Sequence, residues 1–234
     1  MNTPQRVVMI TGAAGNLGRA VAQAFAAKGD ALVLVDLKRE SLAAAFGDES
    51  PQRMFAPADL RKQQDVDGVV RTALERFGHI DVLCNLAGTF RMGEAVHEMS
   101  DATWDLLLDL NARSLLRTAH AVVPAMLKQG SGKIVNVGAY SAQKGAAQMG
   151  AYIASKAVVA RLTETMAAEL RERGINVNAV LPTLIDTPEN RAAMPDADPQ
   201  RWVAPQDLAN VIVFLASDAA RAVHGATLPV TGLS

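Results

Sequence analysis

Residues 7–18 read VVMITGAAGNLG, an apolar run that ends in a glycine-rich turn and continues as a helix-forming segment. The run at 7–10 predicts a buried strand. Gly12, Gly15 and Gly18 occupy the turn and the expected start of the helix. Glycines let a backbone approach a pyrophosphate closely, and the amides of a helix N-terminus favour its negative charge. The context therefore favours a dinucleotide-binding turn over an ordinary glycine-rich turn.

Short apolar runs alternate with helix-length amphipathic segments along the whole chain, which is typical of βαβ units on a parallel sheet. We predict an α/β fold with a doubly wound, mostly parallel, seven-stranded sheet of the Rossmann type, in a single domain spanning residues 1–234. A cofactor is expected to cross the C-terminal ends of the strands. The expected strands lie near residues 7–11, 31–35, 53–58, 82–85, 133–137, 176–181 and 226–230.

Composition narrows the class of partner. The 234 residues include 23 basic and 24 acidic side chains, for a net charge of −1, which argues against nucleic acid or an anionic membrane as the main partner and leaves a small-molecule substrate. The single cysteine, Cys84, excludes an internal disulfide and fits a reducing cytoplasm. No signal peptide or bilayer-length apolar run is expected, and the four scattered histidines predict no metal site.

Asp36 ends the second expected strand, eighteen residues after Gly18. A carboxylate at this place can accept hydrogen bonds from the adenosine ribose hydroxyls and would repel a 2′-phosphate, so NAD is favoured over NADP. Lys38 and Arg39 follow closely and can reach a phosphate, which keeps NADP open as the less favoured cofactor.

Two further strand ends carry candidate cofactor contacts. Asp59 can hold the adenine amino group with Leu60 against the ring, although an N-cap for a helix at 62–77 is an equally good interpretation. Residues 85–88 read NLAG, where small side chains permit close backbone approach. Asn85 can also tie neighbouring strands together, and Cys84 is interpreted as a small buried hydrophobe.

Three residues form a candidate catalytic group. Asn111 lies in the middle of the strongly helical segment 101–128, where an amide is a mediocre helix former, and such local inconsistency is typical of functional sites. Tyr152 and Lys156 are four residues apart, so on a helix they share one face. A nearby ammonium favours the anion of a phenol, which makes Tyr152 a candidate acid–base group.

Together these motifs resemble the short-chain dehydrogenase/reductase family, in order and spacing, over nearly the whole chain. The residues that carry the resemblance are Thr11 to Gly18, Asp36, Asp59, Asn85 to Gly88, Asn111, Tyr152 and Lys156, and Pro182 to Thr187.

The resemblance implies NAD(P)-dependent hydride transfer between a nicotinamide and a carbonyl or alcohol. It implies that Tyr152 moves the proton, that Lys156 holds the nicotinamide ribose and lowers the pKa of the tyrosine, and that Asn111 positions a water. It also implies a substrate lid near 183–204 and a homo-oligomer, a tetramer or dimer. The cofactor contacts expected are Gly12, Gly15, Asn16, Leu17, Gly18, Asp36, Leu37, Asp59, Leu60, Asn85, Ala87, Gly88, Tyr152, Lys156, Pro182 and Thr187.

The chain departs from the family pattern at two places. Asn16 stands where the commonest branch has its middle glycine, and phosphate binding is expected to survive because the outer glycines remain. Ala139 stands where the family has a catalytic serine, and losing such a donor can cost roughly 3 kcal/mol in the transition state. Ser141 is a candidate substitute if a bulge brings it closer, against a serine that bonds locally in a loop.

The missing serine leaves two alternatives open. One is reduction of a quinonoid dihydropterin, whose conjugated imine needs an oxyanion donor less; local stretches such as 181–188 resemble dihydropteridine reductase, although residues 214–232 resemble the general family. The other is a dinucleotide-binding sensor that has lost catalysis, against which the retention of Asn111, Tyr152 and Lys156 argues.

Overall fold

The computed structural model describes residues 5–234, so the first four residues of the predicted domain lie outside it. Within this range the strands form one sheet in the order β3-β2-β1-β4-β5-β6-β7, with every neighbouring pair parallel. The predicted doubly wound architecture is confirmed. The strands are β1 Val7–Thr11, β2 Ala31–Asp36, β3 Arg53–Pro57, β4 Val82–Asn85, β5 Gly132–Val137, β6 Ile175–Pro182 and β7 Thr227–Val230.

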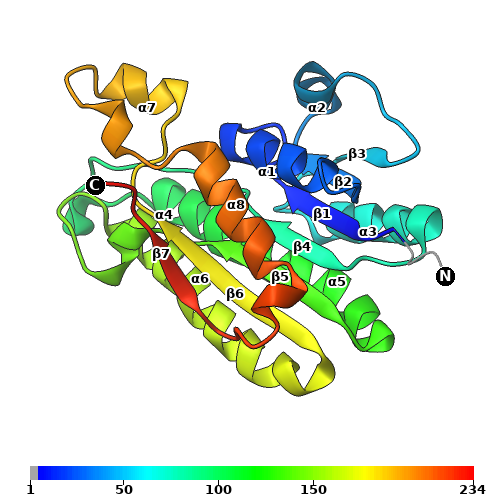
Figure 1. Cartoon of the computed structure of the whole chain (residues 1–234). Helices are drawn as coiled ribbons and strands as arrows, with labels where there is room; N and C mark the ends of the chain where they lie inside the picture. Colours follow the sequence, from blue (N-terminus) through cyan, green and yellow to red (C-terminus); the bar gives the residue numbers. More distant parts are fainter. Residues whose placement is uncertain (1–4) are drawn as a thin grey trace.

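Helices cover both faces of the sheet (Figure 1). Their bounds are α1 Asn16–Ala26, α2 Arg39–Phe46, α3 Gln63–Phe77, α4 Asp101–Leu108, α5 Ser114–Gln129, α6 Gly150–Leu170, α7 Pro188–Ala193 and α8 Pro205–Leu215. Alternate residues of β1 point to opposite cores: Val7 and Met9 pack with α3, α5 and α6, whereas Val8 and Ile10 pack with α1, α2 and α8. Burial on both faces explains why β1 and the first five residues of β2 form continuous apolar runs.

Strand β1 lies where the strand order reverses, because later strands are added to its other side. Strands β2 and β3 add to one side, and the connection through α3 then returns the chain to the other side, where β4 pairs with β1. Thr11 and Asn85 are register partners at the C-terminal ends of these two strands. Ligands of doubly wound sheets bind at such a switch point.

Buried polar side chains tie the sheet to two of its helices. Asn85 on β4 donates to Asn136 on β5 (2.9 Å) and accepts from Thr118 on α5 (2.8 Å). Asn136 in turn donates to Thr163 on α6 (2.9 Å). The prediction that Asn85 links neighbouring strands is confirmed, and the network fixes α5 and α6 against the strands that precede the switch-point crevice.

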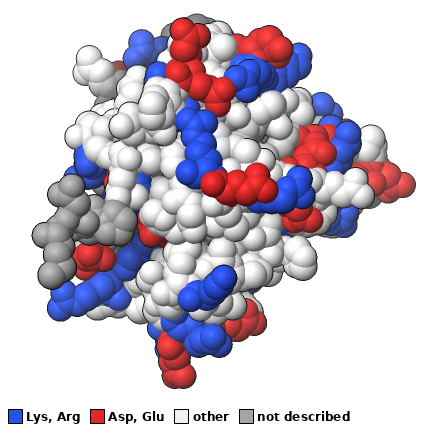
Figure 2. All heavy atoms as spheres, turned by 90° about the vertical axis from the view of Figure 1, so that its right-hand side faces the viewer, with Lys and Arg blue, Asp and Glu red and all other residues white. Residues whose placement is uncertain are grey.

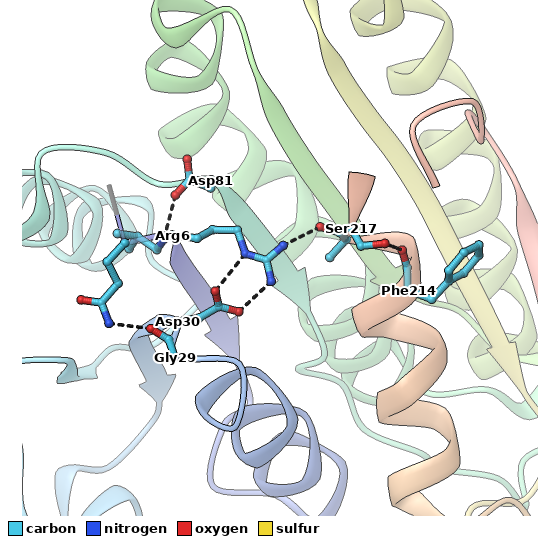
Figure 3. Close-up of polar contacts among 9 residues, drawn as sticks. Arg6, Gly29, Asp30, Asp81, Phe214 and Ser217 are labelled. Carbon is cyan, nitrogen blue, oxygen red and sulfur yellow. Dashed lines mark hydrogen bonds and ion pairs between the residues drawn. The ribbon is translucent and has the colours of Figure 1, made fainter. Parts of the chain in front are cut away.

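A cluster of polar contacts around Arg6 lies at the opposite, N-terminal end of the strands (Figure 3). The Arg6 guanidinium makes two hydrogen bonds to Asp30 (3.0 and 2.6 Å) and one to the Ala216 carbonyl (2.9 Å), and it lies 5.5 Å over the Phe25 ring. Asp81 accepts from the backbone amide of Val7 at 2.7 Å. The cluster joins the start of β1 to the ends of α1 and α8, far from the C-terminal edge of the sheet.

Arg6→Met is expected to lower the free energy of unfolding by about 2 kcal/mol, because it leaves the largely buried Asp30 carboxylate without its bidentate partner. Arg39→Met is a matched control, since Arg39 also pairs with a carboxylate, Glu49, and lies 5.8 Å over a phenylalanine ring, but is more exposed. The control should lose less than about 1 kcal/mol. Urea unfolding of both variants measures the difference, and equal losses would contradict this account.

Charges of both signs are interspersed over the face shown in Figure 2. No helix among the described residues is both long enough and apolar enough to cross a bilayer.

Candidate active site

A cavity of about 710 Å³ opens at the C-terminal ends of β1, β2 and β4. Twelve of the sequence-predicted cofactor contacts line it: Gly12, Gly15, Asn16, Leu17, Gly18, Asp36, Leu37, Asp59, Leu60, Ala87, Gly88 and Thr187. They come from five separate stretches of chain. The lining also includes residues that the sequence did not indicate: Ala14, Ser41, Ala58, Arg61, Leu86, Leu106, Leu110 and Ile185.

The glycines of the first turn are required by close packing. Gly12 has φ +66°, and a Cβ there would lie 3.0 Å from the Ala87 backbone. A Cβ on Gly18 would lie 2.2 Å from the Gly12 carbonyl oxygen. Gly15 faces more open space and caps α1, whose first turn carries no acidic side chain. The turn is therefore compact, and the N-terminus of α1 is presented to the cavity.

Thr11 and Asp36 hold this turn against its neighbours. The buried Thr11 hydroxyl accepts hydrogen bonds from the amides of Leu86 (3.1 Å) and Ala87 (3.2 Å). The Asp36 carboxylate accepts from the amides of Ala14 (2.9 Å) and Leu37 (2.8 Å). Asp36 thus already shapes the turn from the end of β2, besides presenting negative charge to the cavity.

Asp59 lies in the cavity wall but is not a helix cap. Helix α3 begins at Gln63 after Lys62, which makes no side-chain cap bond, so the N-cap interpretation of Asp59 was wrong. Arg61 makes two hydrogen bonds to the Asp59 carboxylate, both 2.9 Å, and holds its pKa below the usual range. Any contact of Asp59 with an adenine amino group therefore competes with Arg61.

Asn111 lies in a π-helical turn, Asp109–Arg113, that interrupts the predicted helix between α4 and α5. Its side chain is buried and fully bonded: the oxygen accepts from the Thr89 amide (2.7 Å), while the nitrogen donates to the Thr89 carbonyl (3.0 Å) and the Ser155 hydroxyl (2.9 Å). Single π-turns within α-helices are frequent at functional sites. The local inconsistency in the sequence is thus explained by a side chain used to hold two other segments.

Ser155 is a connecting residue that the sequence reasoning missed. Its buried hydroxyl accepts from Asn111 and donates to the Tyr152 carbonyl at 2.7 Å. It therefore joins the first turns of α6 to the π-turn. Its place inside the tyrosine–lysine motif was the only available signal.

Tyr152 and Lys156 lie on α6 beside the segment that follows β4. The Lys156 ammonium is buried and donates to the Val137 carbonyl at the end of β5 (2.8 Å). A Cβ on Gly88 would lie 3.2 Å from this nitrogen and 2.9 Å from the Asn111 side-chain oxygen. The Tyr152 ring meets Phe90 edge to face, with centroids 4.8 Å apart. Gly88 also lines the cavity, so the three candidate catalytic residues gather at its rim.

The acidity of the tyrosine differs from the expectation. Burial raises the pKa of Tyr152 to about 12 and lowers the pKa of Lys156 to about 8. The expected lowering of the tyrosine pKa is therefore not found, because burial disfavours the charged phenolate. At neutral pH the phenol is protonated and ready to donate.

Ser141 does not take the place of the family serine at Ala139. Ala139 is buried, and the chain turns after it into a short 3₁₀ helix, Tyr140–Gln143. Ser141 lies exposed on this turn, so the chain neither stays extended nor bulges in the way that its substitution for the serine required.

Two further predicted contacts, Pro182 and Asn85, do not line the cavity, whereas Thr187 does. Pro182 ends β6, buried, and is a register partner of Val230. Thr187 caps α7 by accepting from the Asn190 amide at 3.2 Å. Asn85 is turned into the polar network under the sheet, so its side chain does not line the cavity.

Asn16, which replaces a family glycine, makes a long-range contact. Its amide donates to Glu189 on α7 at 2.8 Å. The segment near 183–204 is thereby held against the glycine turn. Outside the site, Cys84 is buried as expected, with a pKa raised by burial, and Trp202 is also buried.

The described residues fit a nicotinamide dinucleotide. Gly12, Gly15, Gly18 and Gly88 line the cavity without side chains, so a pyrophosphate and a ribose can approach the backbone closely there. A carboxylate stands at the end of β2, and the cavity extends from there along the C-terminal ends of the strands to Gly88 beside Lys156. Fold and site together define a dinucleotide-binding oxidoreductase.

Comparison with known proteins agrees. The family model described as Enoyl-(Acyl carrier protein) reductase matches residues 12–232. The (2S)-[(R)-hydroxy(phenyl)methyl]succinyl-CoA dehydrogenase subunit BbsD of Thauera aromatica is 35% identical, with 99% of this chain and 97% of that protein covered. D-threitol dehydrogenase of Mycolicibacterium smegmatis is 36% identical, covering 97% and 92%. Carveol dehydrogenase from Mycobacterium avium, solved in complex with NAD, superimposes with a TM-score of 0.88 at 29% identity, covering 97% and 96%.

The chain belongs to the short-chain dehydrogenase/reductase family. It is an NAD(P)-dependent oxidoreductase that transfers hydride between a nicotinamide and an alcohol or carbonyl group. The local resemblance to dihydropteridine reductase and the sensor alternative gain no support from these relatives.

Proposed function

We propose that the protein is an NAD(H)-dependent dehydrogenase/reductase of carbonyl and alcohol substrates in which Tyr152 is the general acid and base. The observation that carries the proposal is the convergence of Tyr152, Lys156 and Asn111 on residues 88–90 at the rim of the cavity. The side chains come from two separate elements, since Asn111 lies in the π-turn and Tyr152 and Lys156 lie on α6.

The cofactor, when bound, supplies or accepts the hydride. The amides of the glycine turn and the start of α1 bind its pyrophosphate, and Asp36 accepts from its adenosine ribose. Leu37, Leu60 and Asp59 lie about the adenine. Lys156, beside Gly88, binds the nicotinamide ribose, and Pro182 at the end of β6 and Thr187 at the start of α7 contact the carboxamide.

Tyr152 donates its phenolic proton to the substrate oxygen during reduction and recovers it during oxidation. Its raised pKa suits donation, since the phenol stays protonated at neutral pH. Asn111 acts by holding the Thr89 backbone and Ser155, and so sets the position of the helix turn that carries Tyr152. A bound water completes the proton path at the π-turn.

NADH oxidation with the purified protein tests the proposal. A panel of ketones and aldehydes, with a quinonoid dihydropterin included, should show turnover with carbonyl compounds. Tight NADH binding without turnover of any member would favour the sensor, and turnover of the pterin alone would favour the imine reaction.

We infer a preference for NAD because the Asp36 carboxylate stands where the 2′-phosphate of NADP would be repelled. Asp36→Ser should raise the ratio of kcat/KM with NADPH to that with NADH about tenfold or more, since the carboxylate that repels the phosphate is gone and Lys38 follows closely. Glu40→Gln, a charge change at an exposed site on α2, is the control and should leave the ratio unchanged. An unaltered ratio in the Asp36 variant would remove the argument.

We further infer that the chain acts as one dinucleotide-binding domain, residues 1–234, with a substrate lid near 183–204. Ile185 and Thr187 in the cavity wall and the Asn16–Glu189 contact support the lid. A homo-oligomer is supported by exposed apolar side chains on α4, α5 and α6, namely Trp104, Leu116 and Val158. The lone cysteine supports a reducing location, the cytoplasm.

A further inference from the structure

Large apolar side chains are exposed around Tyr152. Phe90, whose ring meets the tyrosine ring at an interplanar angle of 83°, is 52% exposed, and Met92 is 56% exposed. Tyr140, on the 3₁₀ turn that packs against α6, is 43% exposed. Apolar surface gathered next to a polar reactive group is typical of a small-molecule site.

The two segments that carry these side chains are fixed to each other. The Gly93 amide donates to the Gln148 carbonyl at 2.9 Å. Gln148 has φ +59°, and among residues 5–234 it is the only residue other than glycine with positive φ. A left-handed conformation of this kind persists only where the surroundings determine it, and it is concentrated at ligand sites. The apolar wall is therefore a built feature.

A second, smaller cavity of about 170 Å³ lies between the same segments, next to the start of α6. Three methionines line it, Met92, Met99 and Met149, together with Gly150, Ala151 and the polar residues Arg91, Glu94, Thr103 and Gln148. Thioether side chains adapt to irregular apolar shapes. An apolar cavity of about 150 Å³ is large enough to take a six-membered carbon ring.

Two of the polar side chains at this second cavity, Glu94 and Thr103, are bonded to each other. Glu94 accepts from the Ser100 amide (2.9 Å) and the Thr103 hydroxyl (2.8 Å), which lowers its pKa. On the other side of Tyr152, Ala139 supplies no hydroxyl. A site for a polyol would need hydrogen-bonding groups for each additional hydroxyl, because an unpaired hydroxyl is costly to bury.

We propose, resting on the proposed function, that the substrate is a ketone or secondary alcohol whose reacting carbon carries a non-polar ring or chain of about six carbons. The oxygen meets the Tyr152 hydroxyl, and the carbon body packs against Phe90 and enters the cavity lined by Met92, Met99 and Met149. Substrate selection then depends on apolar area rather than on hydroxyl recognition.

The test compares ketones of increasing apolar area with hydroxylated ketones of equal size, using the full-length protein and NADH. Cyclohexanone and its 4-alkyl derivatives, and straight 2-ketones, should be reduced better than dihydroxyacetone and erythrulose. kcat/KM should rise up to about fourfold for each methylene that becomes buried. A preference for the hydroxylated ketones, or no rise with chain length, would overturn the inference while leaving the proposed function intact.

Two variants locate the effect. Phe90→Ala should lower kcat/KM for the ring ketones about tenfold or more, and Met92→Gln, which keeps the length of the side chain, should flatten the rise with chain length. Phe214→Ala, at an exposed phenylalanine on α8, is the matched control and should preserve both. NADH affinity, measured by fluorescence, checks that each variant is folded.

If the Phe90 and Met92 variants bind NADH and still prefer apolar ketones as the wild type does, Phe90 and Met92 do not contact the substrate. Absence of turnover with every ketone and alcohol, with NADH still bound, would instead overturn the proposed function, and the substrate inference with it.

Discussion

Tyr152→Phe is expected to lower kcat about a thousandfold, because the substrate oxygen then receives no proton from the side chain, and a positioned general acid contributes about 10² to 10⁴ in rate. The phenyl ring remains, so the edge-to-face contact with Phe90 is kept. NADH affinity should change by less than about threefold. Stopped-flow reduction of the best ketone gives the rate, and fluorescence titration gives the affinity.

The chain offers a matched control, since Tyr140 is its only other tyrosine. Tyr140→Phe also removes one phenolic hydroxyl and keeps the ring, but Tyr140 is assigned no proton transfer. This variant should retain at least a third of the wild-type kcat. If the Tyr152 variant kept a tenth of its turnover, the acid–base assignment would have to be abandoned.

Lys156→Met is expected to abolish most turnover and to change how stability depends on pH. Burial lowers the pKa of Lys156 from 10.5 to about 8, so keeping the ammonium charged below pH 8 costs the folded protein about 3 kcal/mol. Methionine avoids this penalty but leaves the Val137 carbonyl without its donor, at about 1–3 kcal/mol. Near pH 7 the two proteins should therefore be of similar stability.

The difference between them should appear above pH 8. Between pH 8 and 10.5 the unfolded lysine binds more protons than the folded one, so the unfolding free energy of the wild type rises with pH relative to the variant. The relative gain should approach about 3 kcal/mol at pH 10.5. Urea unfolding at several pH values measures it, with Lys28→Met at an exposed site as the control for general effects of charge removal. A constant difference across this range would show that Lys156 is not desolvated.

The strands and the glycine turn could be predicted because their signals are local. Strands β1 and β2 are nearly unbroken apolar runs, the other strands are rich in apolar residues, and the turn at Gly12 to Gly18 directly follows β1. The sequence therefore placed the strands near their observed bounds and located most of the cavity wall.

What escaped prediction depends on contacts between distant residues. The bonds of Asn111 reach Thr89 and Ser155, which are 22 and 44 residues away. The sign of the Tyr152 pKa shift is set by burial, which the motif spacing does not report. Phe90 gave no signal at all, because only the folded chain brings its ring against the tyrosine.

The π-turn at Asp109–Arg113 contains one residue more than a regular α-helical turn, and this residue affects both Asn111 and the orientation of α5. A π-turn closes its hydrogen bonds five residues apart instead of four, and each α-helical residue turns the chain by about 100°. Deleting one residue there would let α4 and α5 run on as one regular helix. It would also rotate the buried stripe of α5, including Leu115 and Val122, away from the sheet. The extra residue therefore orients the Asn111 side chain and also determines which face of α5 packs against the sheet. A change in the length of this turn would alter both.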